Sequence, residues 1–125
     1  MYYVYFMSYS YFIPNPMNTG ALLNITLDSN AKLAQRHTEG YYTLNSIDNE
    51  NPNWIQVQGS CAIWYDKELK NWKIGPKEYL GTSTNSLYST KNTKRPDDAT
   101  SWKYWSNNDG KWMSTSNIFG SLGMY

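Results

Sequence analysis

Short runs of strand-forming residues, separated by turn formers, follow one another along most of the chain. In the run 54–58, Ile55 and Val57 alternate with glutamines, and Gly59–Ser60 then permits a tight turn into the run 61–65. Such runs, at a spacing of about 8 to 12 residues, are typical of antiparallel meanders, barrels and sandwiches. Further strands are expected over residues 21–27, 40–47, 72–75, 87–88, 102–106 and 111–113. The pattern therefore predicts an all-β fold, a small antiparallel domain of meander or sandwich type.

One segment, residues 29–38, contains helix formers such as Ala31 and Leu33. Ser29 or Asn30 precedes them in the position of an N-cap. A helix of about ten residues is marginal on its own, so a strand or a loop is an equal alternative here. This is the only helix that the pattern predicts.

Aromatic residues supply much of the burial that aliphatic residues supply in other small domains. They make up 17% of the 125 residues, and all six tryptophans lie between positions 54 and 112. A buried indole needs a partner for its N–H group, which favours rings packed on a sheet. We expect an aromatic-rich core that contains Trp54, Trp64, Trp72 and Trp102.

Three aromatic residues near the last hairpin signal are candidates for stacking on a ligand. Asp109–Gly110 favours a tight turn, because both residues accept a positive φ angle. Trp105 and Trp112 flank this turn on opposite strands and form either a cross-strand aromatic pair or an exposed platform. With Tyr104 they are the predicted ligand-stacking residues.

The N-terminus is an uncharged aromatic segment. Residues 1–13 contain five tyrosines and two phenylalanines, and residues 14–20 form a linker rich in Pro and Asn. The segment has no basic region typical of a signal peptide and is too short for a membrane helix, which needs about 20 apolar residues. We expect an extended N-terminal strand here, followed by a single β-domain over residues 21–125. The candidate residues for an assembly contact are Tyr2, Tyr3, Tyr5, Tyr9 and Tyr11.

This N-terminal strand pairs either within its own sheet or with another chain. A free aromatic strand without charge promotes aggregation, so it needs a partner in both cases. Seven linker residues span up to roughly 23 Å, which is enough for either arrangement.

Charge and chemistry exclude several functions. The formal net charge is +1, so neither nucleic acid nor a membrane surface is an expected partner. His37 and Cys61 are each the only residue of their type, so we expect no zinc site and no internal disulfide. Cys61 is interpreted as a small core residue, with an intermolecular disulfide as the alternative. No catalytic motif is present, and we expect no enzyme activity, no cofactor and no bound metal.

Asn24 begins an Asn–Ile–Thr sequence that matches the acceptor pattern for N-glycosylation. The three-residue pattern often arises by chance. Asn24 is therefore a glycosylation candidate and not an assignment.

The order of aromatic landmarks resembles a Trp/Tyr-rich β-module of multi-repeat, often secreted proteins of algae, protists and marine invertebrates. That module combines Gly-x-Tyr, a Pro-x-Tyr/Trp turn, Trp-x-Ile/Val-Gly, a Leu–Tyr pair, Pro and a final Trp motif. The resemblance covers roughly residues 25–113, in one copy, and lacks the usual Gly before the Pro turn. It implies an extracellular or cell-surface location and no catalytic residue. The module also has a Leu/Ile-x-Tyr/Trp strand before Trp-x-Ile/Val-Gly. The matching positions are Gly40 to Tyr42, Asn51 to Trp54, Ile63 to Tyr65, Trp72 to Gly75, Leu87 to Tyr88, Pro96 and Trp102 to Trp112.

Two classes of function follow from this sequence. In the first, the protein is a structural or adhesive module that assembles with itself or with a larger scaffold through residues 1–13. In the second, it is a carbohydrate-binding module whose exposed rings stack on a glycan.

Overall fold

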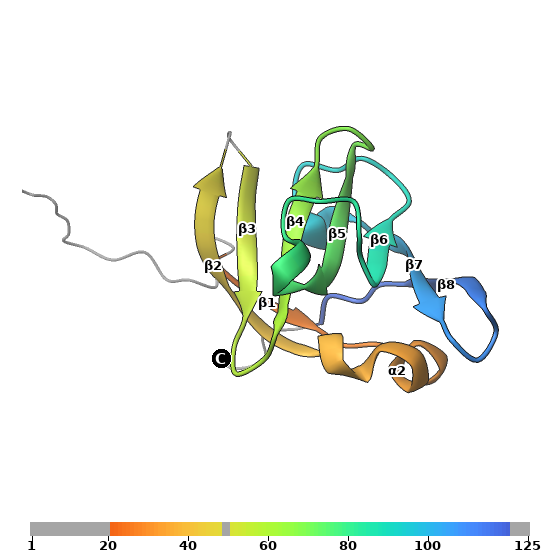
Figure 1. Ribbon diagram of the computed structural model, residues 1–125. Coiled ribbons are helices and arrows are strands. Elements are labelled where there is room, and N and C mark those ends of the chain that lie inside the picture. Colours follow the sequence, from red (N-terminus) through yellow and green to blue (C-terminus); the bar gives the residue numbers. More distant parts are fainter. Residues whose placement is uncertain (1–20, 49–50, 121–125) are drawn as a thin grey trace, which may run out of the picture.

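The computed structural model describes residues 21–48 and 51–120, so the N-terminal segment and its linker lie outside the described residues. The described chain forms one antiparallel sheet of eight strands, each paired with the next one in sequence, which curls into a half-barrel (Figure 1). The predicted all-β meander is thereby confirmed. Its strands are β1 (Leu22–Ile25), β2 (Gly40–Asp48), β3 (Asn51–Gln56), β4 (Cys61–Asp66), β5 (Asn71–Pro76), β6 (Leu87–Ser89), β7 (Ser101–Ser106) and β8 (Lys111–Ser116).

The one α-helix of the described residues, α2 (Ser29–Gln35), connects β1 with β2 and continues into the 3-10 turn η1 (Arg36–Thr38). The predicted helical segment is therefore confirmed, but its cap is Asp28 and not Ser29 or Asn30. The Asp28 Oδ1 atom accepts a hydrogen bond of 2.8 Å from the Ala31 amide. Its Oδ2 atom accepts a second bond, of 2.7 Å, from the Thr115 hydroxyl and so ties the helix to β8. Two further 3-10 turns are η2 (Lys77–Tyr79) and η3 (Pro96–Asp98).

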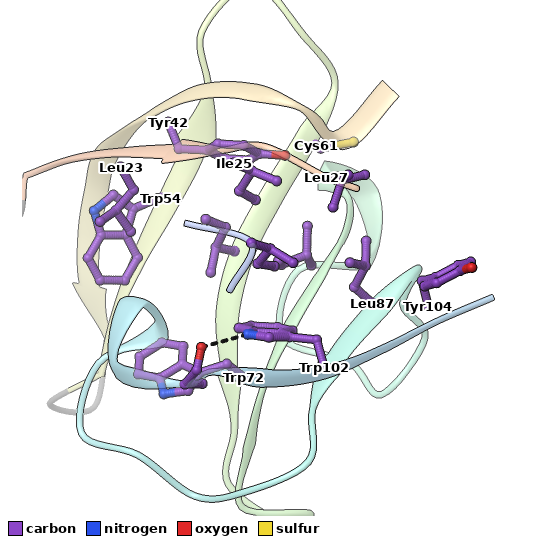
Figure 2. Close-up of a cluster of buried hydrophobic side chains, with 14 of the residues drawn as sticks. Leu23, Ile25, Leu27, Tyr42, Trp54, Cys61, Trp72, Leu87, Trp102 and Tyr104 are labelled. Atoms are coloured by element: carbon purple, nitrogen blue, oxygen red, sulfur yellow. Dashed lines mark hydrogen bonds between the residues drawn. The ribbon is translucent and has the colours of Figure 1, made fainter. Parts of the chain in front are cut away.

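The concave, inner face of the sheet carries the aromatic core. Rings from different strands converge there in Figure 2, and the centroids of Trp54 and Trp72 lie 6.0 Å apart in an edge-on arrangement. The polar edges of the buried rings are satisfied: Trp72 Nε1 donates to the Thr93 carbonyl at 2.9 Å, and Trp102 Nε1 donates to the Ala99 carbonyl at 2.8 Å. Three of the four predicted core tryptophans thus occupy this face.

Trp64 is also buried, at 2% exposure, but on the opposite, outer face of the sheet. Its cross-strand partner is Lys73. This pair is next to the inward-facing pair Ile63–Ile74 and therefore points to the other face of the sheet. The connection between β5 and β6 covers Trp64, whose Nε1 atom donates to the Thr82 carbonyl at 2.9 Å. This connection packs so close to Gly75 that a Cβ atom there would lie 3.1 Å from the Asn85 Cα atom.

The chain after β8 returns to the edge of β1. The Thr26 amide donates to the Ile118 carbonyl at 2.7 Å, and the Gly120 amide donates to the Asn24 carbonyl at 2.9 Å. Ile118 is fully buried by this return. The first strand of the sheet is therefore paired on both sides.

Candidate functional site

The predicted stacking residues Trp105 and Trp112 lie side by side on the outer face, as direct cross-strand partners of β7 and β8. Their ring centroids are 5.5 Å apart at an interplanar angle of 70°. Trp112 also packs on Tyr88 of β6, at 4.9 Å and 70°. The two expected alternatives were a cross-strand aromatic pair and an exposed platform. Trp105 and Trp112 form the cross-strand pair. Because the rings meet edge to face, they do not form one flat surface.

Tyr104 is not part of this group. Neighbouring residues of a strand point to opposite faces of a sheet, and Tyr104 points inward, at 3% exposure, opposite Met113. Burial raises the pKa of its phenol, and the nearby carboxylates of Asp28 and Asp109 raise it further. The three predicted residues consequently belong to two different environments.

Trp105, Trp112 and Tyr88 form an aromatic row on the outer face of the sheet. This row ends at Lys73, a buried lysine that the sequence analysis did not single out. The Lys73 Nζ atom lies 5.2 Å from the centre of the Tyr88 ring and 3.8 Å from Asp66 Oδ2. Its side chain is 3% exposed, and this loss of hydration lowers the lysine pKa, while the Asp66 carboxylate acts in the opposite direction. The sequence contains a signal for the position of Lys73. Trp72 and Ile74 are core residues, so strand alternation puts Lys73 between them on the opposite face. Because the loss of hydration of both charges offsets their attraction, a buried pair of this kind is by itself weak evidence for added stability.

A cleft of about 440 Å³ opens next to this ion pair, between the ends of β3 and β4 and the loop after η2. Its walls combine amide, hydroxyl and carboxylate groups with the residues Trp64 and Tyr65. The side chains of these two residues point to opposite faces of the sheet, because Trp64 is buried on the outer face and the Tyr65 ring packs on Trp72 of the core. Two acidic residues and one lysine lie on its rim, so no single charge dominates. The lining residues are Asn51, Pro52, Asn53, Trp64, Tyr65, Asp66, Lys67, Glu68, Leu80, Gly81, Thr82 and Ser83.

The far edge of β8 has no strand partner among residues 21–48 and 51–120. The Asn117 amide donates to the Thr100 carbonyl at 2.9 Å, and Tyr104 is paired with Met113 in the same register. Because the hydrogen-bonding direction of a strand alternates along its residues, the main-chain groups of Lys111, Met113 and Thr115 face β7. Those of Trp112, Ser114 and Ser116 face away from the sheet, and no residue in the described part of the chain pairs with them.

A hollow of about 230 Å³ lies on the inner side of the same hairpin, between it and α2. Leu33 stands at this hollow and is 78% exposed. The hollow thus combines an apolar wall with a polar rim. Its lining residues are Leu33, Ala34, Tyr104 and Met113, with Asn30, Ser106, Asn108 and Asp109 around them.

The remaining candidate residues have structural surroundings. Cys61 is buried with its Sγ atom 3.8 Å from the His37 carbonyl, and burial raises the pKa of its thiol, which makes it unreactive. Its interpretation as a core residue is confirmed. Asn24 is half-buried within β1, beside the returning C-terminal chain. The candidate assembly residues Tyr2, Tyr3, Tyr5, Tyr9 and Tyr11 lie outside the described residues.

Two classes of site are not found in the described residues. In residues 21–48 and 51–120, no group of three or more His, Cys, Asp or Glu side chains is arranged to hold a metal ion. None of the helices in this part of the chain is long and apolar enough to cross a membrane.

Comparison with protein-family models gave no match, and neither did comparisons with curated proteins and with solved structures. Function is therefore inferred from the contacts and exposed groups described above. Within the described part of the chain, the open edge of β8, the hollow beside it and the cleft near Trp64 offer groups to a partner or ligand.

Proposed function

We propose that the protein is a non-enzymatic structural or adhesive module that assembles by strand addition. Residues 1–13 of one chain supply the added strand, and the partner is another copy or a larger extracellular scaffold. The extracellular or cell-surface location is part of this proposal and derives from the resemblance to often-secreted modules. The single observation that carries the proposal is the open edge of β8.

An open edge strand calls for an explanation, because soluble proteins usually protect such edges with charges, prolines, bulges or covering segments. Between Trp112 and Ser116 the β8 strand contains no charge and no proline, and its pairing with β7 is continuous. Ser114 and Ser116 are exposed. The same chain carries an uncharged aromatic segment that itself needs a strand partner. The edge of β8 offers unpaired main-chain groups, and residues 1–13 offer a strand that can pair with them.

Replacing residues 1–13 with a Gly/Ser sequence of equal length tests the proposal. The intact chain is expected to form oligomers whose mass, measured by size-exclusion chromatography with light scattering, rises with concentration. The replaced chain is expected to be monomeric with an unchanged melting temperature and circular dichroism spectrum. An unfolded product would instead assign the segment to the chain's own core. An equal mass for both chains would contradict the proposal.

Carbohydrate binding is the second candidate, and the cleft near Trp64 favours it. The cleft offers hydrogen-bond donors and acceptors from amide, hydroxyl and carboxylate groups, and its three charged rim residues leave an excess of only one negative charge, which suits a neutral sugar. Its volume of about 440 Å³ lies within the usual range for small-ligand sites, roughly 300 to 1,000 Å³. The Trp105–Trp112 pair is a less suitable platform because its rings are not coplanar.

A panel of neutral di- and trisaccharides, titrated into isotope-labelled protein and followed by NMR, tests this second function. Binding is expected to shift the amide signals of Lys67 and Glu68, and Trp112→Ala is expected to leave these shifts unchanged. Loss of binding in Trp112→Ala would move the site to the outer aromatic row. A sugar concentration of about 10 mM is well above the dissociation constant of a weak complex, about 1 mM. If no sugar of the panel shifts any amide signal at this concentration, carbohydrate binding is removed as a candidate function.

A further inference from the structure

We infer that the hollow between α2 and the β7–β8 hairpin is a receptor for a tyrosine side chain, which residues 1–13 of a second copy supply when they add to β8. This inference rests on the proposed strand addition and names its receiving site. It concerns two features that lie together: the unpaired edge of β8 and the hollow on its inner side.

The position of the hollow relative to the edge supports the inference. Met113 of β8 lines the hollow from the inner face. A strand added to β8 would lie about 4.8 Å beyond it, with every second side chain on the same face as Met113. Those side chains would be directed toward the hollow and toward Leu33 on α2. Strand addition would thereby cover Leu33, the most exposed of the large hydrophobic side chains in the described part of the protein.

The lining of the hollow suits a phenol better than a purely apolar ring. Leu33, Ala34 and Met113 offer an apolar wall to the ring, and Asn108 and Asp109 on the rim offer oxygen atoms to a hydroxyl group. With a volume of about 230 Å³, the hollow has room for an aromatic side chain.

The N-terminal segment presents tyrosine in the matching periodicity. In an extended strand Tyr3, Tyr5, Tyr9 and Tyr11 share one face, so a slip by two residues still brings a tyrosine to the hollow in most registers. The other face carries Tyr2, Val4, Phe6 and Phe12 together with two serines, at positions 8 and 10, and only the two serines match the exposed outer positions at Ser114 and Ser116 of β8.

The geometry favours a second copy over the same chain. The chain after β8 runs antiparallel to β1, with Ile118 beside Thr26, so Ala21 lies at the end of β1 remote from β8. Five residues of strand between Thr26 and Ala21 correspond to about 17 Å. The linker spans at most roughly 23 Å, and an intramolecular path would use most of it before the strand began. A strand from a second copy has no such restriction.

Leu33→Ser and the matched control Leu69→Ser test the site in the full-length chain. Leu69 is also strongly exposed, at 58%, but lies in the β4–β5 turn, away from the hollow. Both changes are expected to leave the melting temperature unchanged. Leu33→Ser is expected to raise the dissociation constant for self-association by about tenfold or more, because burial of one leucine contributes about 1.5 to 3 kcal/mol. Leu69→Ser is expected to have no effect on this constant.

Substitutions in the donor segment give the reciprocal test. Changing Tyr3, Tyr5, Tyr9 and Tyr11 together to Ser is expected to reduce self-association at least as strongly as Leu33→Ser does. Changing the other face, at Val4, Phe6 and Phe12, to Ser is expected to have a clearly smaller effect.

The outcomes separate the inference from the proposed function. If replacing residues 1–13 gives a monomer while Leu33→Ser assembles like the wild type, strand addition stands and the tyrosine site is overturned. Equal effects of substitutions on the two faces of the segment would also overturn the site. If the intact chain is monomeric at every concentration, or if replacing residues 1–13 leaves its mass unchanged, the proposed function itself fails.

Discussion

The two ends of the sheet differ in how their edges are satisfied. At β1 the returning chain supplies main-chain partners at Ile118 and Gly120 and fills the space beside the strand with a fully buried isoleucine. At β8 the outward groups of Trp112, Ser114 and Ser116 have no partner among the described residues. The same meander thus protects its first strand with its own C-terminal chain and leaves its last strand available. A substitution at the first edge should therefore affect stability, and one at the second edge should affect assembly.

Two proline substitutions within β8 should separate these effects most strongly. Met113→Pro removes an amide that faces β7 and leaves its carbonyl partner unpaired, which is expected to destabilise the domain by about 1 to 3 kcal/mol or more. Ser114→Pro removes an amide that faces outward and is expected to cost far less, because proline is tolerated at such edge positions. Urea unfolding measures both free energies, and similar large losses for the two variants would contradict the assigned direction of the Ser114 amide.

Ile118→Ala tests the protected edge at β1. The side chain is fully buried where the chain returns to β1, so its truncation is expected to lower the free energy of unfolding by about 2 to 4 kcal/mol. Val57→Ala, at an exposed position in the turn after β3, is the control and is expected to change it by less than about 0.5 kcal/mol. A small loss for Ile118→Ala would mean that the return of the chain contributes little to closing this edge.

Asp28 links the helix beside the hollow to β8 and should do so in a pH-dependent way. Hydrogen bonds from the Ala31 amide and the Thr115 hydroxyl hold the pKa of Asp28 below its usual value. A carboxyl with a lowered folded-state pKa stabilises the fold above its unfolded pKa of about 3.9, and this stabilisation is lost as the pH falls through the lower folded-state value. Asp28→Ala is expected to cost about 0.5 to 2 kcal/mol at pH 7 and less at pH 2 to 3. Asp28→Asn, which still caps the helix, should lack this acid dependence; an acid-independent cost for Asp28→Ala would contradict the assignment.

The smallest expected effect belongs to the outer aromatic pair next to the open edge. Trp105→Ala and Trp112→Ala, combined in a double-mutant cycle, are expected to give a coupling energy of about 0.5 to 1.5 kcal/mol, as for other edge-to-face pairs. The same cycle for Trp105 and Ser116, which are not in contact across the strands, should give a value near zero. Coupling near zero for the first pair would mean that the rings pack independently.

Much of the sheet was predictable because its signals are local. The strand expected over residues 54–58 is present as β3, although its buried positions are Trp54 and Gln56 and not Ile55 and Val57. The expected turn at Asp109–Gly110 is also present, with a positive φ, 64°, at Gly110 alone of the two residues. The aromatic core follows from rings at alternate strand positions. The opposite orientations of Tyr104 and Trp105 also follow from strand alternation, so grouping the two as one stacking site overlooked an available signal.

Other features depend on contacts between distant residues. Residues 117–120 show no strand pattern, and their pairing with β1 depends on the curvature of the whole sheet. The burial of Trp64 on the outer face depends on the path of the β5–β6 connection. The hollow exists because α2, near the start of the domain, packs beside β7, as the bond of 2.8 Å from Gln35 to the Trp105 carbonyl shows. No local pattern contains this information.

Amide hydrogen exchange at β8 tests strand addition most directly. At concentrations where the intact chain assembles, the outward amides of Trp112, Ser114 and Ser116 are expected to exchange slowly, because residues 1–13 of a second copy accept their hydrogen bonds. In the chain whose residues 1–13 are replaced by Gly/Ser, the same three amides should exchange rapidly, while the inward amides of Met113 and Thr115 remain protected. Equally rapid exchange of the three outward amides in both proteins would contradict strand addition at β8.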